Sequence, residues 1–388
     1  MVKHDVIVIG LGAMGSASVY QLAKYGLNVL GIDQFSPPHT YGSSHGETRI
    51  TRQAIAEGKA YVPLVLRANE IWKEIEAETG RHLYTKTGIL IMASNTSLHP
   101  NKFLDDTIVA ANQYEIEHSE LNANELKGQF PQFNIQGDEK GYFEDGAGFL
   151  YAEECIEAQL ELSVKHGATI NTHEKFLSYH QLSDGILVKT EKAEYLTEKL
   201  VLTVGPWVNE VLPDRYKDSI KIYRQVLYWF EIEGDIQKYQ VGSFPVFNWE
   251  FNTAHENFIY GFPSLDGKSI KIATEQYSEE TTADNVNRVV TEQEIDEMHA
   301  TNIAPYLPDV SRTCARTESC LYSVAPDWRF LLDRHPDNQN IIIASPCSGH
   351  GFKHSAAIGE VITSLVLGVQ PTIDISEFGF DNLTLANA

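Results

Sequence analysis

The chain has 388 residues, of which 43% are hydrophobic and 21% charged, and this is an ordinary composition for a folded globular protein. The length corresponds to about two to three domains. A formal net charge of −23 would repel phosphate backbones, and no apolar run is long enough to span a bilayer, so we expect neither a nucleic-acid nor a membrane partner.

The cysteines narrow the class of protein further. Cys155, Cys314, Cys320 and Cys347 show no C-x-x-C spacing, which argues against a structural zinc site and against the disulfide framework of a secreted protein. The first residues lead directly into a strand pattern, without the pattern of a signal peptide. We therefore expect a cytoplasmic protein without a metal site.

The first elements predict a dinucleotide-binding unit. An apolar run at residues 6–9 leads into Gly10, Gly12 and Gly15 in a G-x-G-x-x-G pattern, then a helical pattern, then a second apolar run that ends on Asp33. The three glycines allow a tight turn, close approach of a pyrophosphate and close helix–strand packing. Asp33 would accept hydrogen bonds from a ribose. The position at the N-terminus favours FAD over NAD, and the alternative is a glycine turn without a ligand.

A polar loop at residues 34–48 follows and ends beside Arg49 and Arg52, which either reach the cofactor or are solvated. Amphipathic periodicity and capping signals predict helices at residues 61–79, 100–114, 124–129, 153–166 and 291–302. Apolar runs predict strands at residues 83–93, 168–171, 176–179, 185–189 and 200–204. The last run leads to Gly205 and Trp207, where backbone can approach a cofactor.

From residue 221 to residue 274 the pattern becomes rich in aromatics and alternates with period two, which predicts antiparallel strands. The strand runs are residues 222–230, 247–251, 258–262 and 270–272. Their aromatic side chains either cover a ligand or form plain sheet core. Near the C-terminus, strand-like runs at residues 321–333 and 340–345 precede a turn of small residues and a final helix to about residue 367.

These patterns predict an α/β protein in which a Rossmann-like FAD-binding domain interleaves with a second α+β domain on a largely antiparallel sheet. We expect the FAD-binding domain to comprise residues 1–82, 148–218 and 320–388. The substrate domain would comprise residues 83–147 and 219–319.

The chain resembles the family of monomeric sarcosine oxidases and N-methyltryptophan oxidases, which are flavoenzymes. The resemblance rests on residues 5–17, 37–52, 61–72, 259–263, 320–322 ahead of 330–333, and 348–353, in the family's order and spread over nearly the whole length. It implies a bound FAD, attached through a thioether between Cys320 and the flavin 8α-methyl group, and we expect a monomer. A thiolate is the nucleophile in such chemistry, and a nearby positive charge favours it.

The resemblance also implies roles for side chains around the flavin. The pair Arg52 and Lys353 would hold a substrate carboxylate, and Lys271 would help the reduced flavin react with oxygen. His45, Arg49, Tyr260, Tyr322 and Glu275 complete the catalytic set. The expected cofactor-binding residues are Gly10, Gly12, Ala13, Met14, Gly15, Asp33, Ser44, Arg49, Thr51, Arg52, Gly205, Trp207, Cys320, Gly349, Gly351, Phe352 and Lys353.

Two positions depart from the family's pattern. Ser44 precedes His45 where the family has two consecutive histidines, and Glu275 stands where the family has a histidine at the substrate site. A carboxylate in place of an imidazole changes the charge of the pocket and favours a substrate with an extra cation. These departures leave the cofactor and the reaction type unchanged, and they leave the substrate open.

The sequence thus favours an FAD-dependent oxidase of N-methyl, sarcosine-like amino acids, which gives an imine, then an amino acid, an aldehyde and hydrogen peroxide. One alternative is a related oxidase or dehydrogenase of another secondary amino acid, whether cyclic, glycated or bulkier, such as N-methyltryptophan. A second is a dinucleotide-binding protein without turnover. An amino acid substrate and oxygen are the expected partners.

Overall fold

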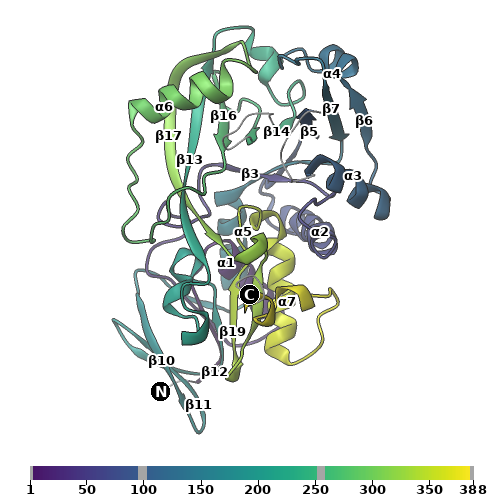
Figure 1. Ribbon diagram of the computed structural model, residues 1–388. Coiled ribbons are helices and arrows are strands. Elements are labelled where there is room, and N and C mark those ends of the chain that lie inside the picture. The colour runs from purple at the N-terminus through teal and green to yellow at the C-terminus, as the bar shows by residue number, and fades with distance from the viewer. Residues whose placement is uncertain (1–2, 95–102, 251–257, 385–388) are drawn as a thin grey trace.

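The computed structural model describes residues 3–94, 103–250 and 258–384. Within these ranges, two eight-stranded sheets lie one above the other (Figure 1). Three further strands form a small separate sheet. The mixed α/β architecture with one mainly parallel and one mainly antiparallel sheet confirms the predicted fold class.

The first sheet forms the lower half of the molecule and has a parallel centre, in which β1 pairs with β2 and β12, β2 with β9, and β12 with β19 (Figure 1). Antiparallel strands extend its edges. Its members are β1 (Lys3–Ile9), β2 (Val29–Ile32), β9 (Thr169–Asn171), β10 (Phe176–Leu182), β11 (Gly185–Thr190), β12 (Glu194–Leu202), β18 (Leu331–His335) and β19 (Asn338–Ser345). The central strands are continuous apolar runs because helices and loops cover both faces.

Helix α1 (Ala13–Lys24) packs against α5 (Ala152–Lys165) and α7 (Ser355–Leu367), and α7 also contacts α2 (Tyr61–Thr79). The approach of α1 to α7 is close, because a Cβ added at Gly359 would lie 2.6 Å from the Ala17 carbonyl oxygen. This packing brings the first and last elements of the chain together on one sheet. The predicted helices at both ends of the chain are therefore neighbours in space.

The second sheet has the order β17-β13-β16-β15-β14-β5-β7-β6 and is antiparallel except for the pair β14 and β5. Its strands are β5 (Ile89–Ser94), β6 (Ser119–Asn122), β7 (Glu139–Glu144), β13 (Lys221–Ile232), β14 (Val246–Glu250), β15 (Phe258–Gly261), β16 (Ser269–Thr274) and β17 (Val310–Val324). The long strands β13 and β17 descend toward the first sheet (Figure 1). They connect the two halves of the molecule.

The remaining elements are short or connect the sheets. They include β3 (Thr48–Thr51), β4 (Tyr84–Lys86), β8 (Gly148–Tyr151), α3 (Phe103–Gln113), α4 (Ala123–Gln129), α6 (Glu292–Met298), α8 (Asp381–Thr384) and a 3₁₀ helix at Gly205–Glu210. Asn122 and Thr291 each form a capping box, and these bonds explain where α4 and α6 begin. Residues 100–102 of the predicted helix at 100–114 lie outside the described residues, and so does residue 251 of the predicted strand at 247–251.

One predicted run is divided in the structure. Residues 321–333 form the end of β17, a 3₁₀ turn at Pro326–Trp328, and the start of β18. Asp327 and Trp328 have positive φ angles of 55° and 54°, which an extended strand cannot contain. The chain therefore turns from the second sheet into the first at this point.

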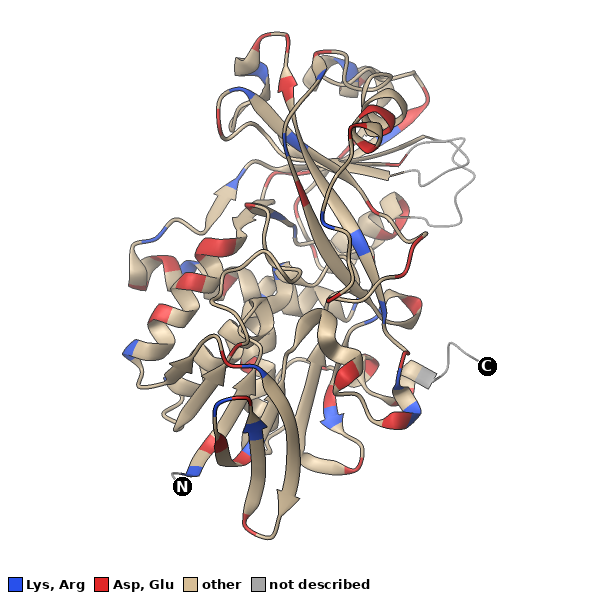
Figure 2. Cartoon of the chain, turned by 90° about the vertical axis from the view of Figure 1, so that its left-hand side faces the viewer, with Lys and Arg blue, Asp and Glu red and all other residues tan. Residues whose placement is uncertain are grey.

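Charged residues are frequent on the helices and loops and also lie on the long strands (Figure 2). Strands β2, β9 and β19 of the first sheet carry none. Among the described residues, no helix is both long and apolar enough to cross a membrane. The same residues contain no group of three or more His, Cys, Asp or Glu side chains arranged to hold a metal ion.

Candidate active site

Two neighbouring cavities lie at the glycine turn and against the second sheet. The first has a volume of about 160 Å³ and is lined by the glycine turn, Asp33 and the 3₁₀ helix that follows β12. The second has a volume of about 730 Å³ and is lined by strands of the second sheet, by β3 and the loop after it, by α3, and by the turn after β19. Ser43, Cys347 and Phe352 line both, so one elongated ligand can extend from one cavity into the other.

The glycine turn is built at the end of β1. Gly10 has a φ angle of 85°, and a Cβ added at Gly15 would lie 1.7 Å from the Gly10 carbonyl oxygen, so both positions require glycine. Helix α1 begins after Gly12 without a side-chain cap. A Cβ added at Gly12 would meet only Ser44 Oγ, at 3.5 Å. The Ala13 N–H donates to Ser44 Oγ at 3.3 Å. Gly12, Ala13 and Met14 line the first cavity, so this helix N-terminus suits a phosphate there.

Asp33 is buried at the cavity wall, and its carboxylate also anchors the backbone. Its Oδ2 accepts a hydrogen bond from the Leu11 N–H at 2.7 Å, and its Oδ1 accepts one from the Phe35 N–H at 2.7 Å. Burial raises the pKa of Asp33, while these two bonds and His39 oppose the rise. Each oxygen keeps a second acceptor position, which is compatible with a ribose hydroxyl.

The first cavity also contains buried polar atoms without a partner. Ser323 Oγ and Ser345 Oγ have no hydrogen-bond partner among the described residues, and both side chains line this cavity. Buried hydroxyls are normally satisfied, so these atoms indicate a missing polar ligand. Together with the glycine turn, they fit the ribose and phosphate groups of FAD.

The second cavity contains a buried cation, Lys271 of β16, which is only 2% exposed. Its Nζ donates to the carbonyl oxygens of Gly46 and Thr48, both at 2.8 Å, and lies 3.9 Å from the centre of the Phe262 ring. Burial and then the nearby Arg49 charge lower its pKa well below the ordinary value. The two carbonyl oxygens and the Phe262 ring therefore hold the Lys271 amino group at the cavity wall.

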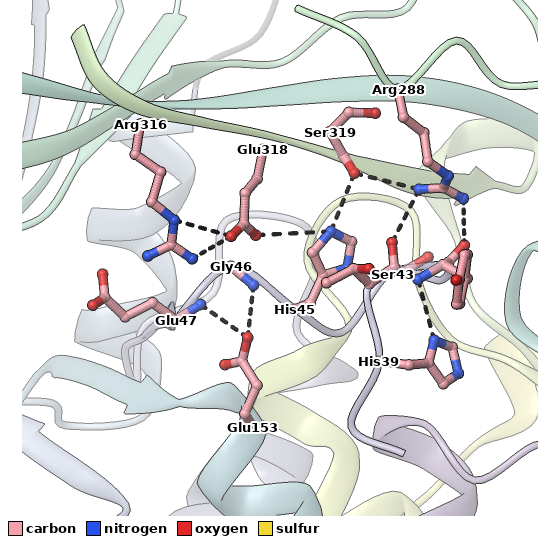
Figure 3. A network of polar contacts seen from close by, with 12 residues as sticks. His39, Ser43, His45, Gly46, Glu47, Glu153, Arg288, Arg316, Glu318 and Ser319 are labelled. Atoms are coloured by element: carbon pink, nitrogen blue, oxygen red, sulfur yellow. Dashed lines mark hydrogen bonds and ion pairs between the residues drawn. The ribbon is translucent and has the colours of Figure 1, made fainter. Parts of the chain in front are cut away.

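The loop that supplies those carbonyls is held by a polar network (Figure 3). Glu153 accepts hydrogen bonds from the Gly46 N–H at 2.8 Å and the Glu47 N–H at 3.2 Å. His45 Nε2 lies 3.1 Å from the Ser319 carbonyl oxygen and 3.9 Å from Glu318 Oε2. Burial, followed by the Arg49 charge, lowers the pKa of His45 to about 4, so the ring is neutral at neutral pH.

Arg49 and Cys320 lie behind this loop. The Arg49 guanidinium donates to the carbonyl oxygens of Ser43 and Thr48. Cys320 is 2% exposed, packs in a cluster with Leu227 and Trp229, and lines neither cavity. Burial raises the pKa of the Cys320 thiol, and the Arg49 charge opposes that rise. Its covalent bond to flavin stays a prediction.

Arg52 and Lys353 lie in one charged group with a residue that the sequence reasoning missed. Arg52 Nη2 pairs with Glu57 Oε2 at 2.7 Å, and Nη1 donates to the Ala54 carbonyl oxygen. Lys353 Nζ donates to the His350 carbonyl oxygen at 2.7 Å. Burial would raise the pKa of Glu57, but Arg52 and its neighbours hold it well below the usual value. Burial lowers the pKa of Lys353 to about 8, although Glu57 opposes that change.

Glu275 faces the same cavity without an ion pair among the described residues. Its Oε2 accepts a hydrogen bond from the Tyr277 hydroxyl at 2.8 Å. A Cβ added at Gly349 would lie 3.2 Å from Oε1, so the carboxylate is directly above that turn. Burial raises the pKa of Glu275 to about 7, and the charge of Glu57 adds to the rise. This group can therefore accept a proton near neutral pH.

The structure brings most of the predicted site residues to the two cavities. Gly10, Gly12, Ala13, Met14, Asp33, Ser44, Gly205, Trp207 and Phe352 line the first. Arg49, Arg52, Tyr260, Lys271, Glu275, Tyr322, Gly349, Gly351, Phe352 and Lys353 line the second. The structure places Gly15, His45, Thr51 and Cys320 behind the walls. Both alternatives for the aromatic strands occur in the structure. Tyr260 and Phe262 line the cavity, while Phe247 and Trp249 form sheet core.

Sequence reasoning missed several polar residues of the second cavity, among them Glu57, Asn248, Glu250, Tyr277 and His350. Two of them had a visible signal. Asn248 and Glu250 alternate with aromatic residues in β14, so a polar face of a half-buried strand was readable. Glu57 had no such signal, because its role depends on the Arg52 side chain that it contacts.

Comparisons with known proteins agree with this geometry. The model of the DAO family, described as FAD dependent oxidoreductase, matches residues 5–365. A monomeric sarcosine oxidase of Bacillus sp. (strain NS-129) is 36% identical over 97% of this chain and 96% of its own length. An N-methyl-L-tryptophan oxidase of Yersinia pestis (strain Pestoides F) is 33% identical over 97% of this chain and 98% of its own length.

Solved structures share the fold at lower identity. NikD, an amino acid oxidase of nikkomycin biosynthesis, superposes with a TM-score of 0.85 at 21% identity and covers 98% of both chains. L-proline dehydrogenase from P. horikoshii gives a TM-score of 0.81 at 20% identity, over 97% of this chain and 96% of its own. By its family match and its full-length relatives, the chain belongs to the FAD-dependent oxidoreductases and is an enzyme that uses FAD.

Proposed function

We propose that the protein is an oxidase of secondary α-amino acids. One observation carries this proposal: the second cavity combines a cationic anchor (Arg52 and Lys353), an acceptor without an ion pair among the described residues (Glu275) and a fixed N–H donor (Lys271). It also shares wall residues with the cavity that suits FAD. Bound FAD would supply the redox chemistry, taking a hydride equivalent from the carbon beside the nitrogen. Relatives named as sarcosine and N-methyl-L-tryptophan oxidases support the substrate class.

In the proposed reaction, the substrate C–H and N–H lose two electrons and two protons, and oxygen gains them as hydrogen peroxide. Water then hydrolyses the imine to an amine and an aldehyde. The substrate carboxylate binds Lys353 and competes with Glu57 for the Arg52 guanidinium, because both carboxylates suit the same fork of donors. The anchor thereby fixes the orientation of the reacting carbon.

Glu275 receives a proton in this scheme. A secondary amine binds mainly as an ammonium at neutral pH, and the nitrogen lone pair is needed for oxidation. The ammonium N–H bond breaks and its proton moves to the Glu275 carboxylate, whose pKa of about 7 suits that transfer. Tyr277 holds the carboxylate in place through its 2.8 Å hydrogen bond.

Lys271 and Cys320 serve the oxidative side of the proposal. The Lys271 N–H that is not bonded to Gly46 or Thr48 stabilises negative charge that develops on oxygen. We propose that Cys320 bonds covalently to the flavin methyl group, supported by its burial and by the nearby Arg49 charge. The S–H bond and one methyl C–H bond would break, and the two electrons would pass to the flavin and then to oxygen. Acid-denatured protein should then retain its yellow colour, and Cys320→Ser should release the flavin.

The organisation of the chain fits this proposal. We propose that residues 1–82, 148–218 and 320–388 form the FAD-binding domain and that residues 83–147 and 219–319 form the substrate domain. The first sheet is built wholly from the former segments, and β17 crosses from one set to the other at residues 319–320. We further propose that the enzyme acts as a monomer in the cytoplasm.

The visible spectrum of purified enzyme under anaerobic conditions tests the function, before and after addition of N-methyl amino acids. The flavin absorbance should bleach and return when air is admitted, with one peroxide formed per turnover. Bleaching that returns only with an artificial electron acceptor would instead indicate a dehydrogenase. A flavin that no secondary amino acid bleaches would contradict the proposal.

A further inference from the structure

The wall of the second cavity formed by β14 and β15 carries a polar column that the proposed chemistry does not use. Asn248 and Glu250 of β14, and Tyr260 and Phe258 of β15, all line the cavity. The antiparallel register pairs Asn248 with Tyr260 and Glu250 with Phe258. Because side chains alternate along a strand, the four side chains share one face, and Glu250 lies about 7 Å beyond Asn248 along β14.

This column runs outward from the reacting groups and passes the carboxylate anchor. Its inner end is at Tyr260, beside Arg49 and Tyr322. At its outer end the Phe258 ring contacts the Phe103 ring, with centroids 5.8 Å apart, and the Arg52 guanidinium lies 4.9 Å from the centre of the Phe103 ring. A substrate whose carboxylate is held at Arg52 can therefore direct its side chain along these rings toward Glu250.

Two independent features show that the column lacks a partner. Asn248 is 7% exposed, and its Oδ1 has no hydrogen-bond partner among the described residues. Glu250 is half-buried and forms no ion pair with those residues. Burial raises its pKa to about 7, and the charge of Asp105 adds to the rise. Asp106 also lines the second cavity, so Glu250 shares the cavity with another carboxylate and has no paired cation among the described residues.

We propose that Asn248 and Glu250 form a subsite for a second cationic group, an ammonium or guanidinium, on the side chain of the secondary amino acid substrate. The inference rests on the proposed function and specifies its substrate class. A carboxylate and an amide oxygen offer acceptors, and an ammonium offers only donors, so the two sets match. The cation neutralises Glu250, and the two phenylalanine rings cover the methylene groups of its side chain.

Paired substrates test the subsite in the holoenzyme. Nα-methyl-L-lysine and Nα-methyl-L-ornithine carry the terminal ammonium, and N-methyl-L-norleucine has a similar chain without it. At least one cationic substrate should exceed norleucine in kcat/KM for flavin reduction by about tenfold or more, the contribution of a charge-assisted hydrogen bond. Glu250→Gln should reduce this ratio toward one. Glu120→Gln removes an exposed carboxylate of the same sheet outside the cavity and should leave the ratio unchanged.

The outcomes separate this inference from the proposed function. If sarcosine and the norleucine derivative reduce the flavin while neither cationic substrate is preferred, the subsite is wrong and the oxidase proposal stands. A preference for fructosyl-glycine over both cationic substrates would also overturn it, because it would assign the acceptors to sugar hydroxyls. If none of these compounds reduces the flavin, the oxidase proposal itself fails. A preference that Glu250→Gln does not alter would place the cation elsewhere.

Discussion

The two cavities of this enzyme are built in different ways. The first depends on backbone: Gly10, Gly12 and Gly15 shape it, the start of α1 lines it, and Asp33 is held by two backbone N–H groups. The second depends on charged side chains of the second sheet, of β3 and the loop after it, and of the turn after β19. A backbone site should respond to substitution through folding or cofactor affinity, whereas a side-chain site should respond through rates and pH.

Substitution of two glycines at the first cavity should give the largest effects. One substitution should lower protein stability, and the other should weaken cofactor binding. Gly15→Ala places a Cβ 1.7 Å from the Gly10 carbonyl oxygen, so it should lower the free energy of unfolding by at least about 3 kcal/mol. Gly12→Ala meets only Ser44 Oγ at 3.5 Å, and Gly12 has a negative φ. It should change the stability of flavin-free protein by less than about 0.5 kcal/mol while weakening FAD binding.

Urea unfolding of flavin-free protein and FAD titration measure the two quantities. Equal loss of stability in both glycine variants would contradict the distinction between a packing glycine and a ligand-facing glycine.

Loss of Lys271 should give the largest kinetic effect in the second cavity. Lys271→Met removes the N–H donors but keeps an unbranched side chain, so flavin reoxidation by oxygen should slow by about 10²–10³-fold. Flavin reduction should change much less. Stopped-flow measurement of the two half-reactions tests this, with Lys268→Met as a control because Lys268 is exposed on the same hairpin. An unchanged oxidative half-reaction would remove the proposed role.

The pH profile of flavin reduction tests Glu275. Its pKa is about 7, so the carboxylate that accepts the substrate proton forms above this pH and the reduction rate should rise through pH 7. In Glu275→Gln this rise should disappear, the rate at pH 8 should fall at least about tenfold, and the dependence should move toward the pKa of the amine. The exposed control Glu279→Gln should keep the original profile.

The smallest effect is expected for Glu153, which holds the loop at Gly46 and Glu47 through hydrogen bonds. Glu153→Ala removes the acceptor of the Gly46 and Glu47 N–H groups, so unfolding free energy should fall by about 1–3 kcal/mol. The neighbouring Glu154→Ala breaks only an exposed pair with Arg81 and should cost less than about 1 kcal/mol. Thermal or urea unfolding of both variants compares them, and an equal loss would show that the loop does not depend on Glu153.

Much of the molecule was predictable because local patterns carried it. Hydrophobic periodicity and capping signals located α2, α5 and α6 within a few residues, and period-two alternation indicated β13 and β16. The run at residues 321–333 was less predictable, because apolar composition does not reveal the positive φ angles at Asp327 and Trp328 that turn the chain between sheets.

The sequence by itself determined the dinucleotide site, because its glycines, strand, helix and acid are contiguous in the chain and act through backbone geometry. Resemblance to a family indicated Lys271, Arg52 and Lys353, but it did not indicate their surroundings. Only the tertiary structure decided that Glu57 pairs with Arg52, that Glu275 has no ion pair among the described residues, and that Asn248 and Glu250 face the cavity. These properties depend on burial and on contacts between segments far apart in the chain, and such contacts exist only after the two sheets pack together.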